Sequence, residues 1–452
     1  MSARADSPSS AVIVGLGRTG LSCARYLHGR GWRVAVTDTR AQPPELERLR
    51  ELDPRIPVRP GGLDTRLLDD ALCVVASPGV SLEDPFFIEA RRRGLEVVGD
   101  IELFARAVDA PVAGITGTNG KSTVTTLIAG MAARAGMTVR VGGNLGEPAL
   151  DLLAAARRAR EATGLYVLEL SSFQLEATDS LDLKAAAVLN VSPDHLDRYR
   201  SVEAYAAAKA RIFARCDTAV INLDDPLVVA MPRPEQRALG FSLRASIGAD
   251  YSVAIRDGGA WLMRRGEPLL PVSAMRIRGL HNAANALAAL ALGEALGLPL
   301  PSMLAELREF TGLAHRTQWV ADLGGVVYID DSKGTNVGAT LAAVSGMDGP
   351  LVIIAGGDGK NQDFGPLAAA FRGKVRHVVL IGRDAPRIAG VLRGVCTTET
   401  CDSLEAAVRS AAAAARAGDT VLLSPACASL DMFRDYAHRG AVFTRAVKEL
   451  AA

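Results

Sequence analysis

Short apolar runs alternate with stretches of helical periodicity along most of this chain. Runs with the length and composition of buried strands lie at residues 11–14, 34–37, 72–76, 165–170, 185–189, 351–355, 378–381 and 421–423. Strands that alternate with helices along a chain are typical of α/β folds with parallel sheets. The pattern therefore predicts an α/β protein whose sheets are mostly parallel.

Two glycine-rich turns and a third strand–helix series divide the chain into modules. The turns begin at Gly15 and Gly114, each after an apolar run, and the third series begins near Ala321. We expect three consecutive Rossmann-like, nucleotide-binding modules. The predicted domains are residues 1–100, 101–312 and 313–452, and the less regular residues 250–276 suit a small meander within the second.

Residues 114–123, G-I-T-G-T-N-G-K-S-T, form a phosphate-binding loop between an apolar run and a helical stretch. Its glycines let backbone N–H groups converge on phosphate oxygens at a helix N-terminus. Lys121 can reach the terminal phosphates, and Ser122 or Thr123 can ligate Mg²⁺. The strict form of this motif has glycine where Ile115 stands, so the loop is a variant type that predicts ATP binding.

Composition narrows the classes of partner. The 452 residues include 51 basic and 50 acidic side chains, with a formal net charge of +1. This balance gives no sign of a strongly basic surface that would bind nucleic acid or an anionic membrane. Small-molecule substrates are expected instead. Six scattered cysteines without a C-x-x-C pair suit reduced thiols and no zinc site. The N-terminus has no apolar signal region and longer apolar stretches are interrupted, so we expect a cytoplasmic protein without membrane insertion.

Lysine is rare in this chain. Only seven of the 51 basic residues are lysine, at positions 121, 184, 209, 333, 360, 374 and 448. A lysine kept against that bias suggests a role that the planar guanidinium of arginine cannot fill, such as a compact charge or a modifiable amine. Lys121, Lys333 and Lys360 each lie in a loop rich in glycine or aspartate.

The first module carries a dinucleotide fingerprint. An apolar run leads into Gly15–Gly20, G-L-G-R-T-G, and Asp38 ends the next run. Such a turn suits any nucleotide diphosphate, and an acid about 20 residues further on can accept from ribose hydroxyls. Ser77 and Gly79 follow another run and can line the same cleft. Taken alone the motif suggests NAD, so a nicotinamide oxidoreductase stays open, as does an ATP-switched binding protein without chemistry.

Polar residues follow the apolar runs of the second module as well. Glu169 lies at the carboxyl end of an apolar run, which is where ligands bind in α/β sheets, and its carboxylate suits Mg²⁺. His195 lies in N-V-S-P-D-H-L-D-R and is either a metal ligand or a capping residue. Periodicity alone makes Lys209 a solvated surface lysine. Asn282 and Asn285 share a helix face, which suits either an adenine edge or helix capping.

Four polar clusters border the strands of the last module, at residues 315–316, 330–336, 356–360 and 424–431. Because the carboxyl ends of parallel strands share one edge of a sheet, we expect these clusters to form one rim. The rim is rich in groups that hold a carboxylate and a ribose. Cys427 has no nearby base in the sequence and is interpreted as a packing residue.

Together these motifs resemble the Mur ligase family over essentially the whole chain. The resemblance is carried by GLGRTG (15–20), DTR (38–40), SPG (77–79), GTNGKST (117–123), LELSSFQLE (168–176), NVSPDHLDRY (190–199), HNAANALAAL (281–290), AHRTQ (314–318), DDSKGTN (330–336), GGDGK (356–360) and SPACASLD (424–431). It implies an ATP-dependent amide ligase of peptidoglycan precursor synthesis. SPACAS, and the absence of a D-N-P-R segment, favour the members that add D-glutamate to UDP-N-acetylmuramoyl-L-alanine over those that add the diamino residue.

The resemblance also implies substrate contacts in each module. The UDP substrate would meet Gly17, Arg18, Thr19, Asp38, Thr39, Arg40, Ser77, Gly79 and Asn144. ATP would meet Gly117, Thr118, Asn119, Gly120, Lys121, Ser122, Thr123, Asn282, Asn285, Arg316 and Asp331. D-glutamate would meet Thr335, Lys360, Ser429, Leu430 and Tyr436. The last module would close over ATP, and the protein would act as a monomer.

Catalysis in the family implies metals and a modified lysine. Lys121, Glu169, His195, Lys209 and Lys333 would be the catalytic residues. Ser122 and Glu169 would hold one Mg²⁺ and His195 a second, with an N-carboxylated Lys209 bridging to that second metal. Three positions depart from the family pattern: Asp330 stands where Asn is expected, Gly334 where Ala is usual, and Tyr436 where Phe is usual.

Overall fold

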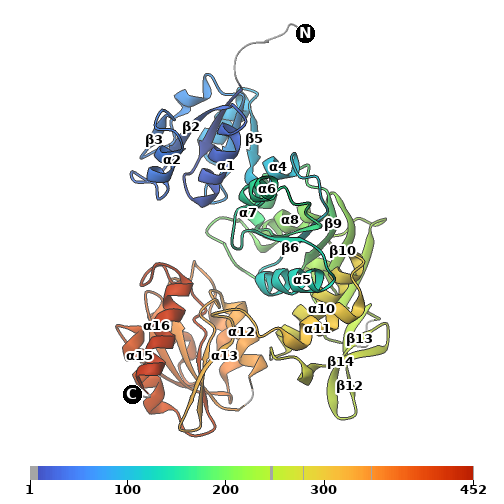
Figure 1. The fold of residues 1–452 in the computed structure, drawn as a ribbon. Coiled ribbons are helices and arrows are strands. Elements are labelled where there is room, and N and C mark those ends of the chain that lie inside the picture. The colour runs from blue at the N-terminus through green and yellow to red at the C-terminus, as the bar shows by residue number, and fades with distance from the viewer. Residues whose placement is uncertain (1–8, 245–247, 278, 348, 451–452) are drawn as a thin grey trace.

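The computed structural model describes residues 9–244, 248–277, 279–347 and 349–450 (Figure 1). Three sheets follow one another along the chain, and the module that carries the second sheet lies between the other two. The predicted α/β class with three Rossmann-like modules is confirmed. The domain boundaries at residues 100 and 312 stay predictions, because the sheets do not define where the connecting residues belong.

The first sheet is parallel, with strand order β3-β2-β1-β4-β5. Its strands are β1 (Ser10–Val14), β2 (Arg33–Asp38), β3 (Val58–Pro60), β4 (Cys73–Ala76) and β5 (Glu96–Gly99). Helices α1 (Arg18–His28), α2 (Leu46–Leu52) and α4 (Asp100–Ala105) cover one face, and α3 (Pro85–Arg92) with the 3₁₀ turn η1 (Thr65–Leu68) covers the other. Alternate residues of β1 enter these two cores, as the two-residue period of a strand requires.

The second sheet has the order β14-β13-β12-β11-β10-β9-β6-β8-β7. Its strands are β6 (Val112–Thr116), β7 (Val139–Gly143), β8 (Leu165–Glu169), β9 (Leu183–Val188), β10 (Cys216–Asn222), β11 (Arg237–Ser242), β12 (Tyr251–Arg256), β13 (Gly259–Arg264) and β14 (Glu267–Pro271). The last three form the predicted meander, which is antiparallel and extends the main sheet through β11.

Helices of the second module lie on both faces of this sheet. They are α5 (Lys121–Arg134), α6 (Ala149–Ala159), α7 (Ser172–Glu176), α8 (Val202–Ala210), α9 (Pro226–Val229), α10 (Leu280–Ala295) and α11 (Leu300–Glu309), with the 3₁₀ turns η2 (Arg211–Phe213) and η4 (Val272–Ala274). The buried helix α10 packs against α5 and brings Asn282 and Asn285 to the start of α5. That contact joins two segments of the chain about 160 residues apart.

The third sheet has the order β15-β16-β20-β17-β18-β19, and only β15 runs antiparallel to its neighbour. Its strands are β15 (Gln318–Leu323), β16 (Val326–Asp330), β17 (Leu351–Gly356), β18 (Val375–Ile381), β19 (Thr397–Thr400) and β20 (Thr420–Leu423). Helices α12 (Val337–Gly346), α13 (Gly365–Phe371) and α14 (Ala385–Leu392) cover one face, and α15 (Leu404–Ala414) and α16 (Tyr436–Glu449) cover the other.

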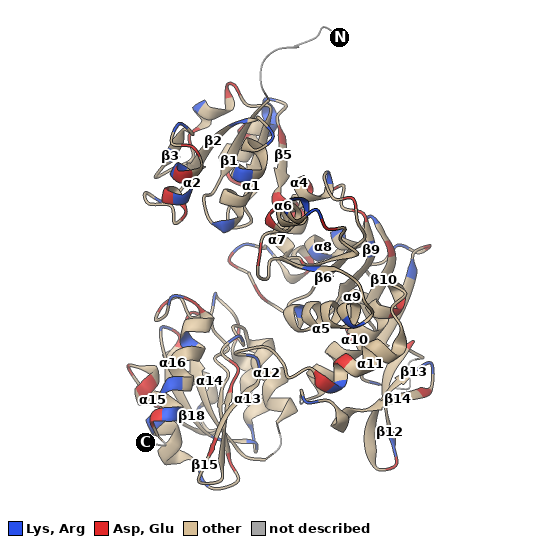
Figure 2. Cartoon of the chain, in the orientation of Figure 1, with Lys and Arg blue, Asp and Glu red and all other residues tan. Residues whose placement is uncertain are grey.

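Basic and acidic residues are interspersed along all three modules (Figure 2). No helix within the described residues is long and apolar enough to cross a membrane.

Candidate active site

The phosphate loop connects β6 to α5, and two of its glycines have backbone angles that other residues rarely adopt. Gly117 has φ 147° and Gly120, the residue before α5, has φ 84°. A Cβ at Gly120 would lie 2.3 Å from Asn285 Oδ1. Lys121 Nζ donates to the carbonyls of Gly117 and Thr118 at 2.9 and 3.0 Å. The Lys121 side chain therefore folds back over the phosphate loop.

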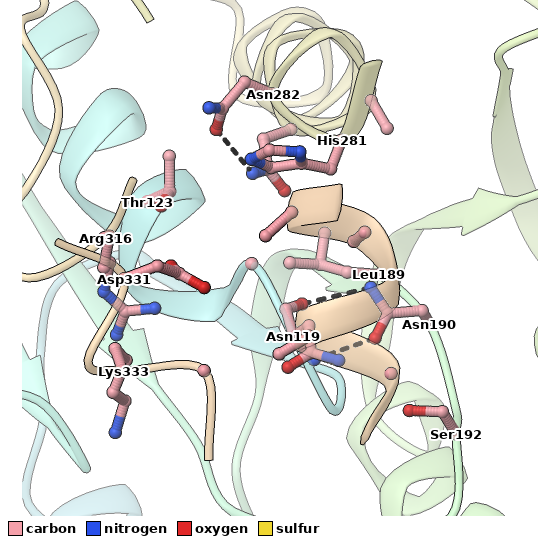
Figure 3. A pocket seen from close by; sticks show the side chains of 18 of the residues that line it. Asn119, Thr123, Leu189, Asn190, Ser192, His281, Asn282, Arg316, Asp331 and Lys333 are labelled. Atoms are coloured by element: carbon pink, nitrogen blue, oxygen red, sulfur yellow. Dashed lines mark hydrogen bonds between the residues drawn. The ribbon is translucent and has the colours of Figure 1, made fainter. Parts of the chain in front are cut away.

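A cavity of about 290 Å³ lies between α10 and α12, and we call it the helix-side cavity (Figure 3). Seven of the residues predicted for ATP line it, namely Asn119, Gly120, Thr123, Asn282, Asn285, Arg316 and Asp331. Asn285 Nδ2 donates to Asn282 Oδ1 at 3.2 Å, so the two carboxamides orient one another. The cavity has residues of both the second and the third module in its walls.

A second cavity of about 270 Å³ lies at the other side of the phosphate loop, and we call it the loop cavity. All five predicted catalytic residues line it, namely Lys121, Glu169, His195, Lys209 and Lys333. It shares Asn119, Gly120, Arg316 and Lys333 with the helix-side cavity. The two cavities therefore meet across the phosphate loop.

Ser122 and Glu169 form the centre of a hydrogen-bonded group in the loop cavity. Ser122 Oγ donates to Glu169 Oε2 at 2.5 Å, and Asn144 Nδ2 donates to Glu169 Oε1 at 2.8 Å. Arg316, from the third module, donates from Nη2 to Ser122 Oγ at 2.6 Å. Burial raises the pKa of Glu169, but the nearby Lys121 charge and these hydrogen bonds outweigh it and lower the pKa overall. The carboxylate is thus held in its ionised form.

Lys209 is buried, with 1% of its side chain surface exposed, so the interpretation from periodicity as a surface lysine is wrong. Its Nζ donates to Gly117 O at 3.0 Å and lies 4.4 Å from the centre of the Tyr205 ring. Burial, and then the charge of Lys121, hold the pKa of Lys209 well below its usual range. Tyr205 and Lys209 are four residues apart and share the inner face of α8.

His195 also lines the loop cavity, on a turn where its φ is 55°. Its ring packs edge-on against Phe173 at 5.0 Å. Burial lowers its pKa, which favours the neutral imidazole that binds metals. Next to it, Asp194 Oδ1 accepts a hydrogen bond from Lys360 Nζ of the third module at 2.8 Å.

The polar clusters of the third module form the predicted rim, because β16, β20 and β17 are neighbours in the sheet. Asp331 accepts from Ser424 Oγ at 2.8 Å, and burial raises its pKa to about 7. Lys333 Nζ lies 4.1 Å from the centre of the Tyr436 ring, and burial lowers its pKa to about 8. Lys333 lines both cavities and Asp331 lines the helix-side cavity, so two titratable side chains lie where the cavities meet.

The residues predicted for D-glutamate are only partly brought together. Thr335 and Lys360 line the loop cavity. Tyr436 lies under Lys333. Ser429 is buried and Leu430 is 72% exposed, and neither is among the residues that line the loop cavity. Their assignment stays a prediction.

A third cavity of about 510 Å³ lies at the carboxyl edge of the first sheet, and we call it the first-module cavity. All nine residues predicted for the UDP substrate line it. Asp38 accepts from Leu16 N and from three nitrogens of Arg40 at 2.6 to 2.9 Å. Both oxygens of this carboxylate are therefore held by groups of the first module. Asn144 lines the loop cavity as well as this one, so the two adjoin.

Comparison with known proteins decides between the interpretations left open by the sequence. Residues 9–99 match the family model for the Mur ligase MurD-like N-terminal domain, residues 115–293 the Mur ligase middle domain, and residues 315–427 the Mur ligase glutamate ligase domain. A protein of Methylococcus capsulatus named UDP-N-acetylmuramoylalanine–D-glutamate ligase is 51% identical over 446 residues, which cover 99% of this chain and 96% of that protein. The chain belongs to the Mur ligase family.

Solved structures share the Mur ligase fold. The UDP-N-acetylmuramate-alanine ligase MurC of Thermotoga maritima has a TM-score of 0.62 at 19% identity, covering 98% of this chain and 99% of that one. The MurF ligase of the same organism, solved in complex with ADP, has a TM-score of 0.61 at 16% identity, covering 86% and 98%. At this identity the similarity shows the common architecture of three modules.

In this Mur ligase, several cavity residues were not among the predicted site residues. Asn190, Asn222, Phe241 and His281 line the helix-side cavity, and Asp194, Tyr205 and Asn336 line the loop cavity. Asn190 follows β9 and Asn222 ends β10, so both lie at the carboxyl edge of the sheet, where ligands bind in α/β folds. That rule could have found them from the sequence.

Proposed function

We propose that this chain joins D-glutamate to UDP-N-acetylmuramoyl-L-alanine while it converts ATP to ADP and phosphate. The observation that carries the proposal is the position of the loop cavity. It adjoins the first-module cavity at Asn144 and the helix-side cavity at Arg316 and Lys333. A nucleotide-linked carboxylate and an ATP γ-phosphate can therefore meet at Lys121.

Each module has its own part in this proposal. Residues 1–100 bind the UDP end of the substrate through the nine side chains around the first-module cavity. Residues 101–312 bind ATP through the phosphate loop, with Asn282 and Asn285 at the adenine. Residues 313–452 bind D-glutamate and close over ATP, with Arg316 and Asp331 at the ribose and phosphates. Closure would exclude water that competes with the amine.

The chemistry begins with a carboxylate that is a poor electrophile. An oxygen of the L-alanyl carboxylate attacks the γ-phosphorus of ATP, ADP leaves, and an acyl phosphate forms. The amine of D-glutamate then attacks the acyl carbon, and the tetrahedral intermediate loses phosphate and a proton to give the amide. In this proposal Lys121 and Lys333, which both line the loop cavity, offset the charge that develops in these steps.

The donor atoms at the phosphate loop suit Mg²⁺, which prefers oxygen ligands. The Ser122 hydroxyl and the Glu169 carboxylate would hold one ion, and they are already in contact with each other. His195 and a carbamate on Lys209 would hold the second. When bound, these ions would neutralise phosphate charge.

N-carboxylation of Lys209 fits its surroundings. A carbamate forms only from a neutral amine, and burial favours that form at Lys209. The amine also faces the loop cavity, where a carbamate would reach the candidate metal ligands. Arginine could not replace lysine in this role.

D-glutamate would be held by Thr335 and Lys360 in the loop cavity, with Ser429, Leu430 and Tyr436 completing the site on the side of the third module. We also propose that the protein is cytoplasmic, because its six cysteines are unpaired, as a reducing compartment favours.

A phosphate-release assay tests the proposed function. The purified chain is mixed with ATP, Mg²⁺, UDP-N-acetylmuramoyl-L-alanine and D-glutamate, and each component is omitted in turn. The proposal predicts phosphate release that requires both substrates. Parallel reactions with L-glutamate, L-lysine and meso-diaminopimelate should release far less. Absence of substrate-dependent release would contradict the proposal.

A further inference from the structure

Asn336 connects the second and third modules through a single buried carboxamide. It lies between β16 and α12 and is 3% exposed. Its Oδ1 accepts from Ala339 N at 2.8 Å and so caps α12. Its Nδ2 lies 3.2 Å from Asp194 Oδ2 and 3.3 Å from Asn119 Oδ1, both in the second module. One side chain thus serves its own helix and two partners across the module boundary.

Its partner in the phosphate loop is held firmly in place. Asn119 N donates to Asn190 Oδ1 at 2.8 Å, and Asn190 Nδ2 donates back to Asn119 O at 3.1 Å. The Asn119 side chain also donates to Asn336 Oδ1 at 3.4 Å. Asn336 therefore contacts a fixed point of the loop through a reciprocal pair of carboxamides.

Its other partner holds a second residue of the third module. Asp194 is 5% exposed, and while Oδ2 accepts from Asn336, Oδ1 accepts from Lys360 Nζ at 2.8 Å. The backbone N–H of His195 donates to the same Oδ1 at 2.9 Å and fixes the carboxylate. One carboxylate of the second module thus anchors Lys360, a residue of the predicted glutamate site, and Asn336, the neighbour of Thr335 in that site.

We propose that Asn336 is a positioning residue that holds the third module against the phosphate loop and so places Thr335 and Lys360 for the amino-acid substrate. The glutamate part of this inference rests on the proposed function. A carboxamide suits the position because it donates to a carboxylate and accepts from a helix N-terminus at the same time. Neither a hydroxyl nor a carboxylate can do both with this reach.

Asn336→Ser separates the two roles of this residue. Serine caps helices about as well as asparagine, so α12 keeps its cap, while the donor to Asp194 and the contact with Asn119 are lost. We expect the KM for D-glutamate to rise about tenfold, since a hydrogen bond to a charged acceptor is lost, and kcat at saturating D-glutamate to change less than about threefold. The Tm should match that of the parent. Asn336→Ala, which also loses the cap, should lower the Tm as well.

Small-angle scattering with ADP, Mg²⁺ and D-glutamate gives a readout that does not depend on activity. Asn336→Ser should have a larger radius of gyration than the parent. The exchange variant Asn336→Asp/Asp194→Asn restores a donor–acceptor pair but removes the charge that pairs with Lys360, so its radius should fall between those of Asn336→Ser and the parent. A parental KM and radius in Asn336→Ser, or failure of the exchange variant to contract, would overturn the inference. Absence of glutamate-dependent phosphate release in the parent would instead overturn the proposed function, and scattering would still decide the role of Asn336.

Discussion

Asp100 begins α4 at the junction of the first and second modules, and its carboxylate is buried. Oδ2 accepts from Gln174 Nε2 at 3.0 Å, whereas Oδ1 is buried without a hydrogen-bond partner within the described residues. Desolvation raises its pKa to about 6 from the usual 3.8, although the Gln174 bond acts in the opposite direction. Asp100→Asn removes the buried charge and keeps an oxygen that can accept from Gln174.

The size of the effect follows from this pKa. Because the pKa rises from 3.8 to about 6, ionisation of this carboxyl costs about 3 kcal/mol more in the folded state than in water. The amide nitrogen of the variant takes the place of Oδ1, which has no hydrogen-bond partner within the described residues, and burying this unpaired donor costs about 1 kcal/mol. The net gain for Asp100→Asn at pH 8 is therefore about 2 kcal/mol. In a cooperative unit of about 200 residues this raises the Tm by about 4 to 8 °C.

The sign depends on pH. The folded-state pKa of Asp100 lies above the unfolded value, so the folded state binds more protons between about pH 4 and pH 6. The free energy of unfolding of the parent consequently falls as the pH rises through this window, and that of the Asn variant does not. The advantage of the variant should be absent below pH 4 and complete above pH 7.

Thermal melts of the parent and of Asp100→Asn at one-unit steps from pH 4 to pH 8 check this prediction. Asp151→Asn is the matched control, because Asp151 lies at the same junction, accepts from Ser22 Oγ at 2.8 Å and is only partly buried. It should change the Tm by less than about 2 °C. The reasoning is refuted if Asp100→Asn gives no gain at pH 8, or the same gain at pH 4.

Three further substitutions test the site itself. Gly120→Ala should lower kcat/KM for ATP about 100-fold, because its Cβ would lie 2.3 Å from Asn285 Oδ1, whereas Gly136→Ala has the same φ of 84° with no atom within 4 Å and should leave ATP kinetics unchanged. Lys209→Ala should lower kcat about 100- to 1,000-fold and recover part of it with added acetate, and a fully active Lys209→Arg would refute N-carboxylation. Tyr436→Phe should change kcat/KM for D-glutamate less than about threefold, since the ring face under the neighbouring lysine remains, whereas Tyr436→Leu should lower it; equal kinetics of the two variants would contradict a role for the ring.

Local motifs predicted much of the fold and of the site. The residues around the first-module cavity follow from a glycine-rich turn and the ends of neighbouring strands, which are arranged alike in every sheet of this type. The phosphate loop is likewise defined by its own glycines, and the rim of the third module follows from the order of its strands. In each case, a recognisable turn or the carboxyl end of a strand determines where the residues lie.

Tertiary packing decided the rest. The small, mainly alanine side chains of α8 give only a weak indication of its inner face, so the burial of Lys209 depends on how that helix lies against the phosphate loop. Asp194 and Asn336 meet only because two modules close on each other, and no pattern in either segment records the other. Phe241 lines the helix-side cavity from β11, which is far along the chain from the phosphate loop in the same cavity wall.

Transfer of oxygen from the substrate to phosphate tests the central claim most directly. UDP-N-acetylmuramoyl-L-alanine is labelled with ¹⁸O in its carboxylate and incubated with ATP, Mg²⁺, D-glutamate and the enzyme, and the released phosphate is analysed by mass spectrometry. Because the attacking carboxylate oxygen leaves with the phosphate when the amide forms, the account predicts one ¹⁸O in each phosphate released. Phosphate that carries no ¹⁸O while the amide product accumulates would contradict it.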